Sequence, residues 1–254
     1  MRRFTSLIRV LLALTWTGLT ALPFLPILVL LLPWRYARVV VAAVYGKIFC
    51  GPSLAIFGIR PVYEGLEHLR ANPRAVYVTN HASNVDPFIG MWMNPIGNVG
   101  VAKREVVWIP VFGQMYFLSG HLLINRSDAR GAVAALNDTA AVAAKHGVGM
   151  WIWPEGTQPR DGRLLPFKKG FVHLAIATGL PVIPVVAHDA HLRWPARSLD
   201  IRPGPLRIQI LPPISTADWS PDTAQDHADA VHDVFARALS PHQRPLDASH
   251  SAPE

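Results

Sequence analysis

The sequence is short of cysteine and of charged side chains. Cys50 is the only cysteine among 254 residues, which excludes an intrachain disulfide framework and a multi-cysteine metal cluster. Charged residues make up 16% of the chain, against about 25% in an ordinary soluble domain. Half of the residues are hydrophobic, which excludes a disordered, solvated chain. The length suits one good-sized domain and a little extra.

Acidic residues are the scarcer of the two charge types. The chain has 17 Asp and Glu against 24 Lys and Arg, a formal net charge of +7, and 19 of the basic residues are arginine. An excess of arginine suits bidentate recognition of phosphate, carboxylate or an anionic lipid surface. Nucleic acid is the other common partner of a basic chain.

Charge is absent from a long segment near the start. Residues 10–32 carry none, and 23 residues suffice to cross a hydrocarbon core. Pro23 and Pro26 interrupt this segment, and a second apolar stretch at 39–59 carries only Lys47. We predict two helices, joined at the prolines, that enter one leaflet as a hairpin. A single true span and a cleaved signal peptide are the alternatives, and basic residues on both flanks give no orientation.

After residue 60, short β-rich runs alternate with helical patterns. We expect strands at 75–79, 98–102, 122–124, 148–153, 181–187 and 206–211, and helices from Ser127 or Asp128 to about 147, at 167–178 and at 224–239. This alternation predicts an α/β domain with a largely parallel sheet flanked by helices. The expected domains are a membrane-associated hairpin (1–59), the α/β domain (60–239) and a flexible tail (240–254).

The residues after the first of these strands are suited to acid–base chemistry. Positions five apart lie about 140° apart around a helix, so His81 and Asp86 could not meet in one. Pro87 disfavours helix in the residue before it and favours a helix start. A loop can therefore fold His81 onto the Asp86 carboxylate, which leaves the other ring nitrogen free as a general base. In the alternative interpretation, Asp86 only caps the following helix and His81 is an ordinary loop residue.

Two further segments offer polar groups at strand ends. Trp153 to Thr157 closes an expected strand, and open α/β sheets bind ligands at the carboxyl ends of their strands. Four basic residues follow it: Arg160, Arg163, Lys168 and Lys169. Arg126 follows another expected strand and could bind a phosphate bidentately. The alternative for the segment that begins at Trp153 is a solvated surface loop. The alternative for Arg126 is a surface ion pair.

In their order and in their residues, these segments resemble the motifs of the 1-acyl-sn-glycerol-3-phosphate acyltransferase family of the glycerolipid acyltransferase superfamily. Its four blocks and intervening segments are matched by Asn80, His81, Ser83 and Asp86 (N-H-x-S-x-x-D), Ala102 to Glu105 (A-K-R-E), Ile109 to Gly113 (I-P-x-x-G), Arg126, Trp153 to Thr157 (F-P-E-G-T), Leu165 to Gly170 (L-P-F-K-K-G) and Val182 to Val185. Trp153 replaces the usual Phe. Gln158 replaces an arginine, so one expected phosphate contact is absent, and Arg160 is the candidate to compensate.

The resemblance implies transfer of a fatty acyl chain from acyl-CoA or acyl-carrier-protein to the sn-2 hydroxyl of lysophosphatidic acid, giving phosphatidic acid. It implies His81 as the base, Asp86 as its orienting partner, and no acyl-enzyme intermediate. The substrate-binding residues that it implies are Lys103, Arg126, Glu155, Gly156, Thr157 and Arg160. Beyond the donor as cosubstrate it implies no cofactor and no metal. The expected location is the membrane, at the cytoplasmic face of the inner membrane.

Other functions fit the sequence less well. A serine hydrolase needs a G-x-S-x-G turn and a zinc hydrolase an H-E-x-x-H helix, and the sequence has neither. His188, His191, His227 and His232 lack carboxylate partners in a convincing pattern. A membrane-bound binder of nucleic acid or anionic lipid would explain the charge but not His81 and Asp86, so we expect no nucleic-acid partner. Another lysolipid acceptor stays open.

Overall fold

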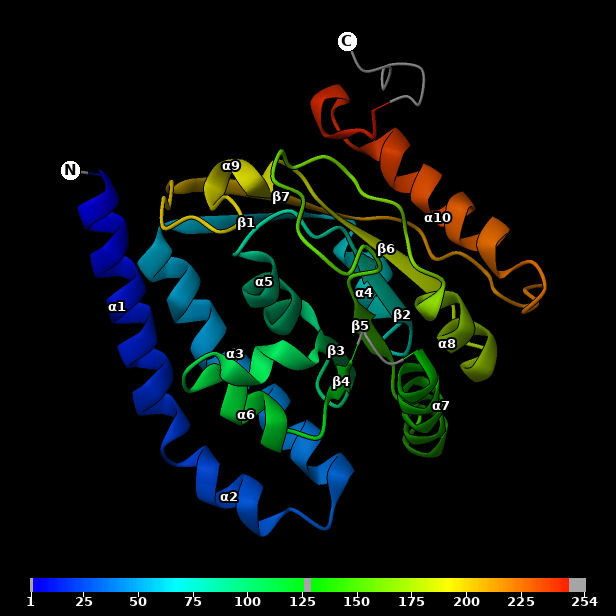
Figure 1. Cartoon of the computed structure of the whole chain (residues 1–254), viewed down its shortest axis with the longest axis horizontal. Coiled ribbons are helices and arrows are strands. Elements are labelled where there is room, and N and C mark those ends of the chain that lie inside the picture. Colours follow the sequence, from blue (N-terminus) through cyan, green and yellow to red (C-terminus); the bar gives the residue numbers. More distant parts are fainter. Residues whose placement is uncertain (1, 126–128, 247–254) are drawn as a thin grey trace.

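The computed structural model describes residues 2–125 and 129–246. Its seven strands form one sheet in the order β1-β7-β6-β2-β5-β3-β4 (Figure 1). The strands are β1 (Ile59–Glu64), β2 (Val76–Thr79), β3 (Val99–Lys103), β4 (Leu122–Ile124), β5 (Met150–Ile152), β6 (Val182–Ala187) and β7 (Gly204–Ile210). The pair β6–β7 is antiparallel and the other pairs among the described residues are parallel. The predicted largely parallel sheet is confirmed.

The central strands are apolar because both faces of the sheet are covered. Every residue of β2, β5 and β6 is buried, as expected of strands between two helical layers. Successive side chains point to opposite faces. Val76 and Val78 therefore join one core, whereas Tyr77 joins the other, where it stacks on Trp151 with 5.4 Å between ring centroids.

Helices cover the two faces separately. The core that contains Val76 is completed by α7 (Ala129–His146), α8 (Gly170–Thr178) and α10 (Ala224–Ala238). The core that contains Tyr77 is completed by α5 (Asp86–Met93) and by residues of the first and third helices of the chain. The shorter helices are α4 (Leu66–Ala71), α6 (Phe112–Leu118), α9 (Ala190–Arg193), η1 (Arg104–Trp108) and η2 (Pro241–Gln243).

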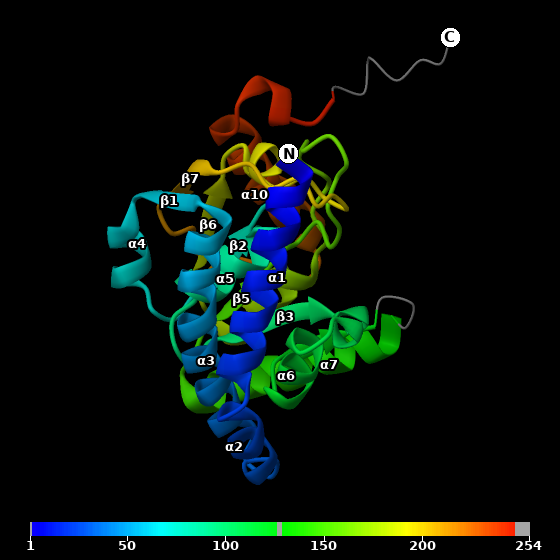
Figure 2. The same cartoon turned by 90° about the vertical axis from the view of Figure 1, so that its left-hand side faces the viewer.

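The N-terminal segment forms three helices: the two long apolar helices that the sequence predicts and one short helix between them. They are α1 (Arg2–Ala21), α2 (Phe24–Leu30) and α3 (Arg35–Phe57). Pro23 directly precedes α2 and Pro26 lies in its first turn, where a missing N–H breaks no helical hydrogen bond. The prolines therefore separate α1 from a short extra helix. Figure 2 shows α1 and α3 side by side, with α2 at one end of the molecule.

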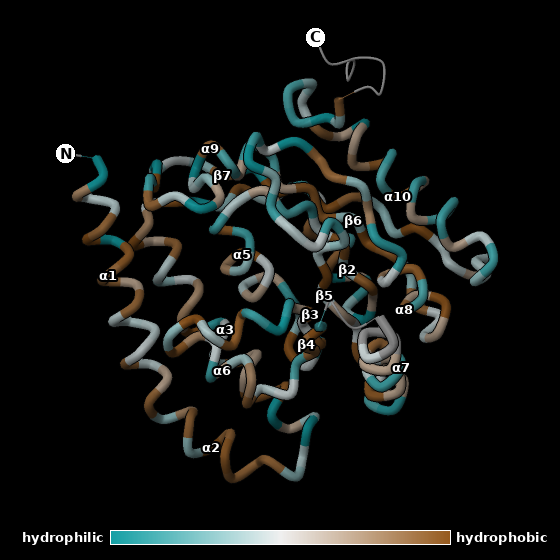
Figure 3. The backbone as a smooth tube through the Cα atoms, viewed as in Figure 1, coloured by the Kyte–Doolittle hydropathy of each residue, from teal (hydrophilic) through white to brown (hydrophobic). Residues whose placement is uncertain are grey.

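Many residues of the N-terminal helices are hydrophobic (Figure 3), and several of them are exposed. Leu11, Leu19, Leu22 and Leu30 are between 54% and 75% exposed. Helices α1 and α3 are long and apolar enough to cross a membrane, by length and composition. An exposed apolar surface of this kind marks contact with a membrane or another protein. The N-terminal helices are therefore candidates for membrane association.

Arg35 and Arg38, the basic residues that follow the first apolar stretch, have partners inside the protein. The Arg35 guanidinium donates to the Gly120 carbonyl over 2.9 Å and forms an ion pair with Asp138. The Arg38 guanidinium donates to the Leu118 carbonyl over 2.7 Å. Both side chains therefore fasten the start of α3 to the turn before β4.

The structure differs from several other expectations. Strand β1 was not predicted, because Pro61 and alternating polar residues weaken its pattern; it pairs with β7 as an edge strand, where proline is tolerated. Helix α8 begins at Gly170 rather than at Phe167, which packs into the core ahead of the helix. The capping residues expected for α7, Ser127 and Asp128, lie outside the described residues.

The C-terminal part differs from the expected flexible tail as far as residue 246. Pro241–Gln243 forms η2, and Gln243 is fully buried. The Gln243 carbonyl accepts a hydrogen bond from the Leu164 N–H over 2.8 Å. This segment is therefore packed against the loop that follows β5. The domain bounds at residues 59 and 239 stay a prediction.

Candidate active site

The His81 loop leaves the sheet at the point where the chain changes direction. After β2 the chain moves to β3 and β4 on one side, and after β5 it crosses to β6 on the other. Strands β5 and β6 run parallel to β2 on either side of it, so their carboxyl ends meet at one edge. Ligands of open α/β sheets bind at such a switch point.

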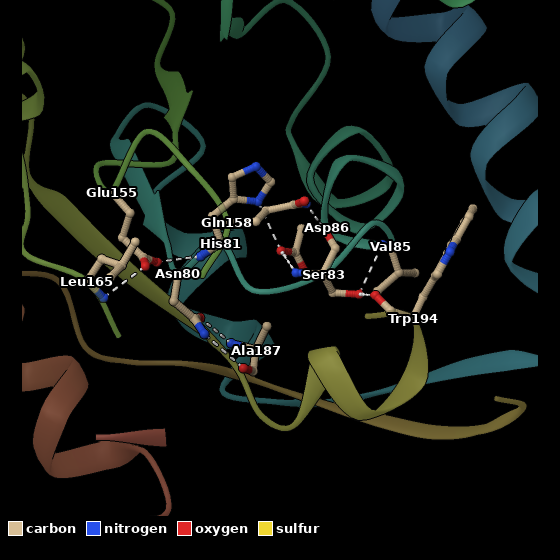
Figure 4. Close-up of polar contacts among 10 residues, drawn as sticks. All are labelled: Asn80, His81, Ser83, Val85, Asp86, Glu155, Gln158, Leu165, Ala187 and Trp194. Atoms are coloured by element: carbon tan, nitrogen blue, oxygen red, sulfur yellow. Dashed lines mark hydrogen bonds and ion pairs between the residues drawn. The ribbon is translucent and has the colours of Figure 1, made fainter. Parts of the chain in front are cut away.

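His81 and Asp86 are in contact, as the sequence predicted. His81 Nδ1 lies 3.0 Å from Asp86 Oδ2 (Figure 4). The same oxygen accepts the Ser83 backbone N–H over 2.7 Å. The Asp86 side chain is 2% exposed and the His81 side chain 19%. Because Asp86 occupies Nδ1, the ring nitrogen of His81 that could act as a base is Nε2.

Asn80 and Ser83 hold this loop in place. The Asn80 amide donates to the Ala187 carbonyl over 3.0 Å and accepts the Ala187 N–H over 2.8 Å, so the ends of β2 and β6 are tied together. The Ser83 hydroxyl donates to the Trp194 carbonyl over 2.7 Å. Sequence reasoning noted both residues in the first block but gave them no structural task. Fixed partners of this kind hold catalytic groups in one geometry.

Glu155 is buried behind His81 rather than open to a ligand. Its side chain accepts the His81 backbone N–H over 2.6 Å and the Leu165 N–H over 3.0 Å, and the residue is 3% exposed. Burial raises the pKa of the Glu155 carboxyl to about 8, the two backbone N–H groups lower this pKa, and the Asp86 charge raises it further. Its substrate-binding role stays a prediction, and its contacts place it as a support for the His81 backbone.

We expect Glu155→Gln to flatten the pH dependence of stability. The pKa of Glu155 is about 8 in the folded chain against 4.5 ordinarily. Between these values the folded state keeps a proton that the unfolded state has released, so stability falls as pH rises through this window. The Tm of the native protein should therefore decline more steeply from about pH 5 to about pH 8 than that of Glu155→Gln. Thermal melts measure both slopes, with the exposed Glu67→Gln as the control. Equal slopes for native protein and Glu155→Gln would contradict the assignment.

The rest of the third block lies against the His81 loop. The Gln158 amide donates to the Ser83 carbonyl over 2.6 Å, and the Trp153 ring centroid is 5.4 Å from that of His81. Gly156 has a left-handed φ of 74°, the conformation that glycine adopts without strain. Thr157 and Arg160 are exposed beyond this turn. Gln158 therefore joins the two blocks, in place of the arginine expected from the resemblance.

Of the other predicted substrate-binding residues, Lys103 lies outside this cluster. Lys103 is exposed at the end of β3, which is separated from β2 by β5, so the two strand axes are about 10 Å apart. Arg126 lies outside the described residues. The structure thus brings together His81, Asp86 and the loop after β5, and it places Lys103 at the side of this group.

Comparisons with known proteins agree with this arrangement. A family model described as Acyltransferase matches residues 60–188. A 1-acyl-sn-glycerol-3-phosphate acyltransferase from Limnanthes douglasii is 43% identical over 232 residues, covering 91% of this chain and 82% of the relative. A protein of the same name from Escherichia coli K12 is 32% identical over 198 residues, covering 78% and 80%. The crystal structure of the 1-acyl-sn-glycerophosphate acyltransferase PlsC from Thermotoga maritima shares the fold, with a TM-score of 0.71, 23% identity and coverage of 94% and 96%.

Proposed function

Because this chain belongs to the 1-acyl-sn-glycerol-3-phosphate acyltransferase family, we propose that it acylates the sn-2 hydroxyl of lysophosphatidic acid. The product is phosphatidic acid, and the donor is the thioester of acyl-CoA or acyl-carrier-protein. The proposal includes no cofactor beyond this cosubstrate and no nucleic-acid partner. The observation that carries it is the contact of 3.0 Å between His81 Nδ1 and Asp86 Oδ2 at the switch point of the sheet.

The reaction follows from the one free nitrogen of His81. Nε2 takes the proton of the acceptor hydroxyl while the oxygen attacks the thioester carbonyl carbon. A C–O bond forms, the C–S bond breaks, and the departing thiolate takes the proton back from His81. The Asp86 carboxylate holds the imidazole in one tautomer and stabilises the imidazolium between these steps. No side chain of the protein becomes acylated.

The proposed acceptor site lies beside His81 on the loop after β5. Thr157 and Arg160 are exposed there, and Gln158 is engaged with the Ser83 carbonyl. Because the glutamine side chain carries no charge, the positive charges that bind the acceptor phosphate come from Arg126, Arg160 and Lys103 in this proposal. A different lysolipid acceptor is the second candidate, favoured only by this replacement of an arginine.

Arg126→Ala is expected to weaken the use of lysophosphatidic acid by about tenfold to a hundredfold, since a charge-assisted hydrogen bond contributes about 1.5–3 kcal/mol. Arg126→Lys should recover only part of the loss, because an ammonium group lacks the planar fork of a guanidinium. Steady-state kinetics with varied acceptor measure both, with Arg70→Ala on α4 as the control. If Arg126→Ala raises only the donor KM, this arginine binds the donor instead.

A small, mainly apolar cavity lies beside the helix that begins at Asp86. It lies among α3, α5 and α6, and its lining includes Gly46, Phe49, Met91 and Phe112. Helix α5 begins at Asp86, so the same helix contributes a cavity wall and the partner of His81. The cavity measures about 40 Å³, less than a fatty acyl chain occupies, and Asn94, Ser119 and His121 also line it. It therefore provides an apolar wall beside α5 rather than a site for the whole acyl chain.

The N-terminal helices place the enzyme at the bilayer in this proposal. Lysophospholipid and product both reside in the membrane, and an apolar helical surface with basic flanks lies in the interface plane. The exposed apolar residues of α1 and α2 supply that surface. We propose insertion of the hairpin into one leaflet, at the cytoplasmic face of the inner membrane.

Cysteine labelling in sealed vesicles tests this topology. In a Cys50→Ala background, Arg3→Cys on α1 and Asp222→Cys before α10 should react with a water-soluble maleimide from the same side. Leu30→Cys, at a position 75% exposed in α2, should be protected because lipid covers it. Labelling of Arg3→Cys and Asp222→Cys from opposite sides would replace the hairpin by a true span.

A panel of acceptors tests the proposed activity. Purified protein is given labelled acyl-CoA or acyl-carrier-protein with lysophosphatidic acid, lysophosphatidylcholine or lysophosphatidylethanolamine. We expect acylation of lysophosphatidic acid well above that of the other two. Preferential acylation of a lysolipid with a different headgroup would favour the second candidate.

A further inference from the structure

Asp189, His191 and His242 lie together beside the proposed active site. One donor atom of each is within 4.8 Å of the other two. Asp189 and His191 stand at the start of α9, directly after β6, whereas His242 lies in η2, 53 positions beyond Asp189. The fold therefore assembles a cluster in which His191 gains the carboxylate neighbour that the sequence pattern did not reveal.

The side chains of Asp189 and His242 are in contact, and His191 has a ring nitrogen that is hydrogen-bonded to no described residue. His242 Nε2 lies 2.7 Å from Asp189 Oδ1. His191 Nδ1 is buried and has no hydrogen-bond partner among the described residues. Most buried polar atoms in proteins have a partner, and His191 Nδ1 is therefore available as a metal donor.

The backbone around the cluster is arranged to permit close approach. Gly162 has a φ of 77°, and a Cβ there would lie 2.3 Å from His191 Cγ, so only glycine lets this loop close over the imidazole. Asp189 has a φ of 55°, in the left-handed region that aspartate and asparagine tolerate better than other side chains. At Gly162 and Asp189 the backbone therefore adopts conformations that few residue types allow, and these conformations let the three side chains approach one another.

The donor set of the cluster suits a transition-metal ion. It comprises the carboxylate of Asp189 and the ring nitrogens of His191 and His242. Two imidazoles and one carboxylate are donors that zinc(II) accepts, with water completing the coordination. Magnesium and calcium prefer oxygen donors throughout.

We propose that Asp189, His191 and His242 bind one divalent transition-metal ion, with zinc(II) as the best fit. The ion fastens η2 to the β6–α9 turn. Gln243, the residue after His242, accepts the Asp189 N–H over 3.0 Å through Oε1 and the Leu164 N–H over 2.8 Å through its carbonyl. Leu165 in turn donates to Glu155. The metal therefore stabilises the segment that packs against the loop after β5.

Metal titration of the purified full-length protein in detergent, after treatment with a chelator, tests the site. Zinc(II) is titrated by calorimetry and cobalt(II) by visible absorption. We expect one ion per chain and a rise in Tm of about 3 °C or more on saturation, because an ion that binds only the folded state stabilises it.

The variants Asp189→Asn and His242→Gln are expected to weaken zinc binding at least about tenfold, a loss that even outer-shell changes produce. Asparagine tolerates the left-handed backbone of Asp189, and His242 is 55% exposed, so both variants keep the fold, which metal-free melts verify. His173→Ala, which removes an exposed histidine of α8, should bind as the native protein does.

Two results would overturn the proposal. One is the lack of saturable zinc binding by the native protein, which would leave the Asp189–His242 contact as a simple ion pair. The other is equal binding by native protein, Asp189→Asn and His242→Gln, which would place the metal on other histidines.

Discussion

Replacing His81 by alanine is expected to lower acyl transfer by about 10²–10⁴-fold while the fold is kept, because this is the range lost with a general base. The side chain is partly exposed, and within the described residues its one polar contact is with Asp86. The backbone N–H that Glu155 accepts is unaffected by the substitution. The loss should therefore appear in kcat with labelled acyl-CoA and lysophosphatidic acid, and the Tm should change little.

The control for this variant is His173→Ala, an exposed histidine on α8, which should retain native activity. A folded His81→Ala protein with native-like turnover would contradict the proposed mechanism. It would require another group to take the proton of the acceptor hydroxyl.

The second large effect is expected for Asp86→Asn, about 10²–10⁴-fold in kcat. Asparagine keeps the shape of the side chain and can still accept the Ser83 N–H that Asp86 Oδ2 accepts over 2.7 Å. It lacks the negative charge that stabilises the imidazolium formed during proton transfer. The effect should therefore fall on kcat, with the KM for lysophosphatidic acid nearly unchanged.

Kinetics at varied acceptor concentration separate this role from a binding role. A rise in KM with an unchanged kcat would mean that Asp86 contacts the acceptor rather than His81. Asn84→Ala offers a comparison within the same loop, because the Asn84 amide donates to the Pro195 and Ser198 carbonyls and not to His81 or Asp86 among the described residues. It should lower Tm more than kcat.

The parts of the fold with strong local patterns could be predicted from the sequence. The apolar run of β2 and the proline at position 87 sufficed for a strand, a loop and a helix that starts at Asp86. Strand β1 was missed because Pro61 and its polar neighbours resemble a loop until β7 pairs with them. Its formation depends on a partner more than a hundred residues away along the chain.

The same distinction applies to the site. The His81–Asp86 contact spans five residues and could be predicted from the helix period and Pro87. The Asn80–Ala187 pair spans 107 residues and the contact of Glu155 with the His81 backbone spans 74. Neither has a local signal, because such contacts exist only after the strands are ordered. The cluster of Asp189 with His242 was missed for the same reason.

The position of the transferred acyl group tests the central claim most directly. Purified protein is incubated with 1-acyl lysophosphatidic acid and labelled acyl-CoA, and the products are analysed by mass spectrometry with fragmentation. The account predicts phosphatidic acid that carries one labelled chain at sn-2, with one free CoA released per product and no label on the protein. Label recovered as free fatty acid, or as a stoichiometric adduct on the protein, would contradict direct transfer to the acceptor hydroxyl.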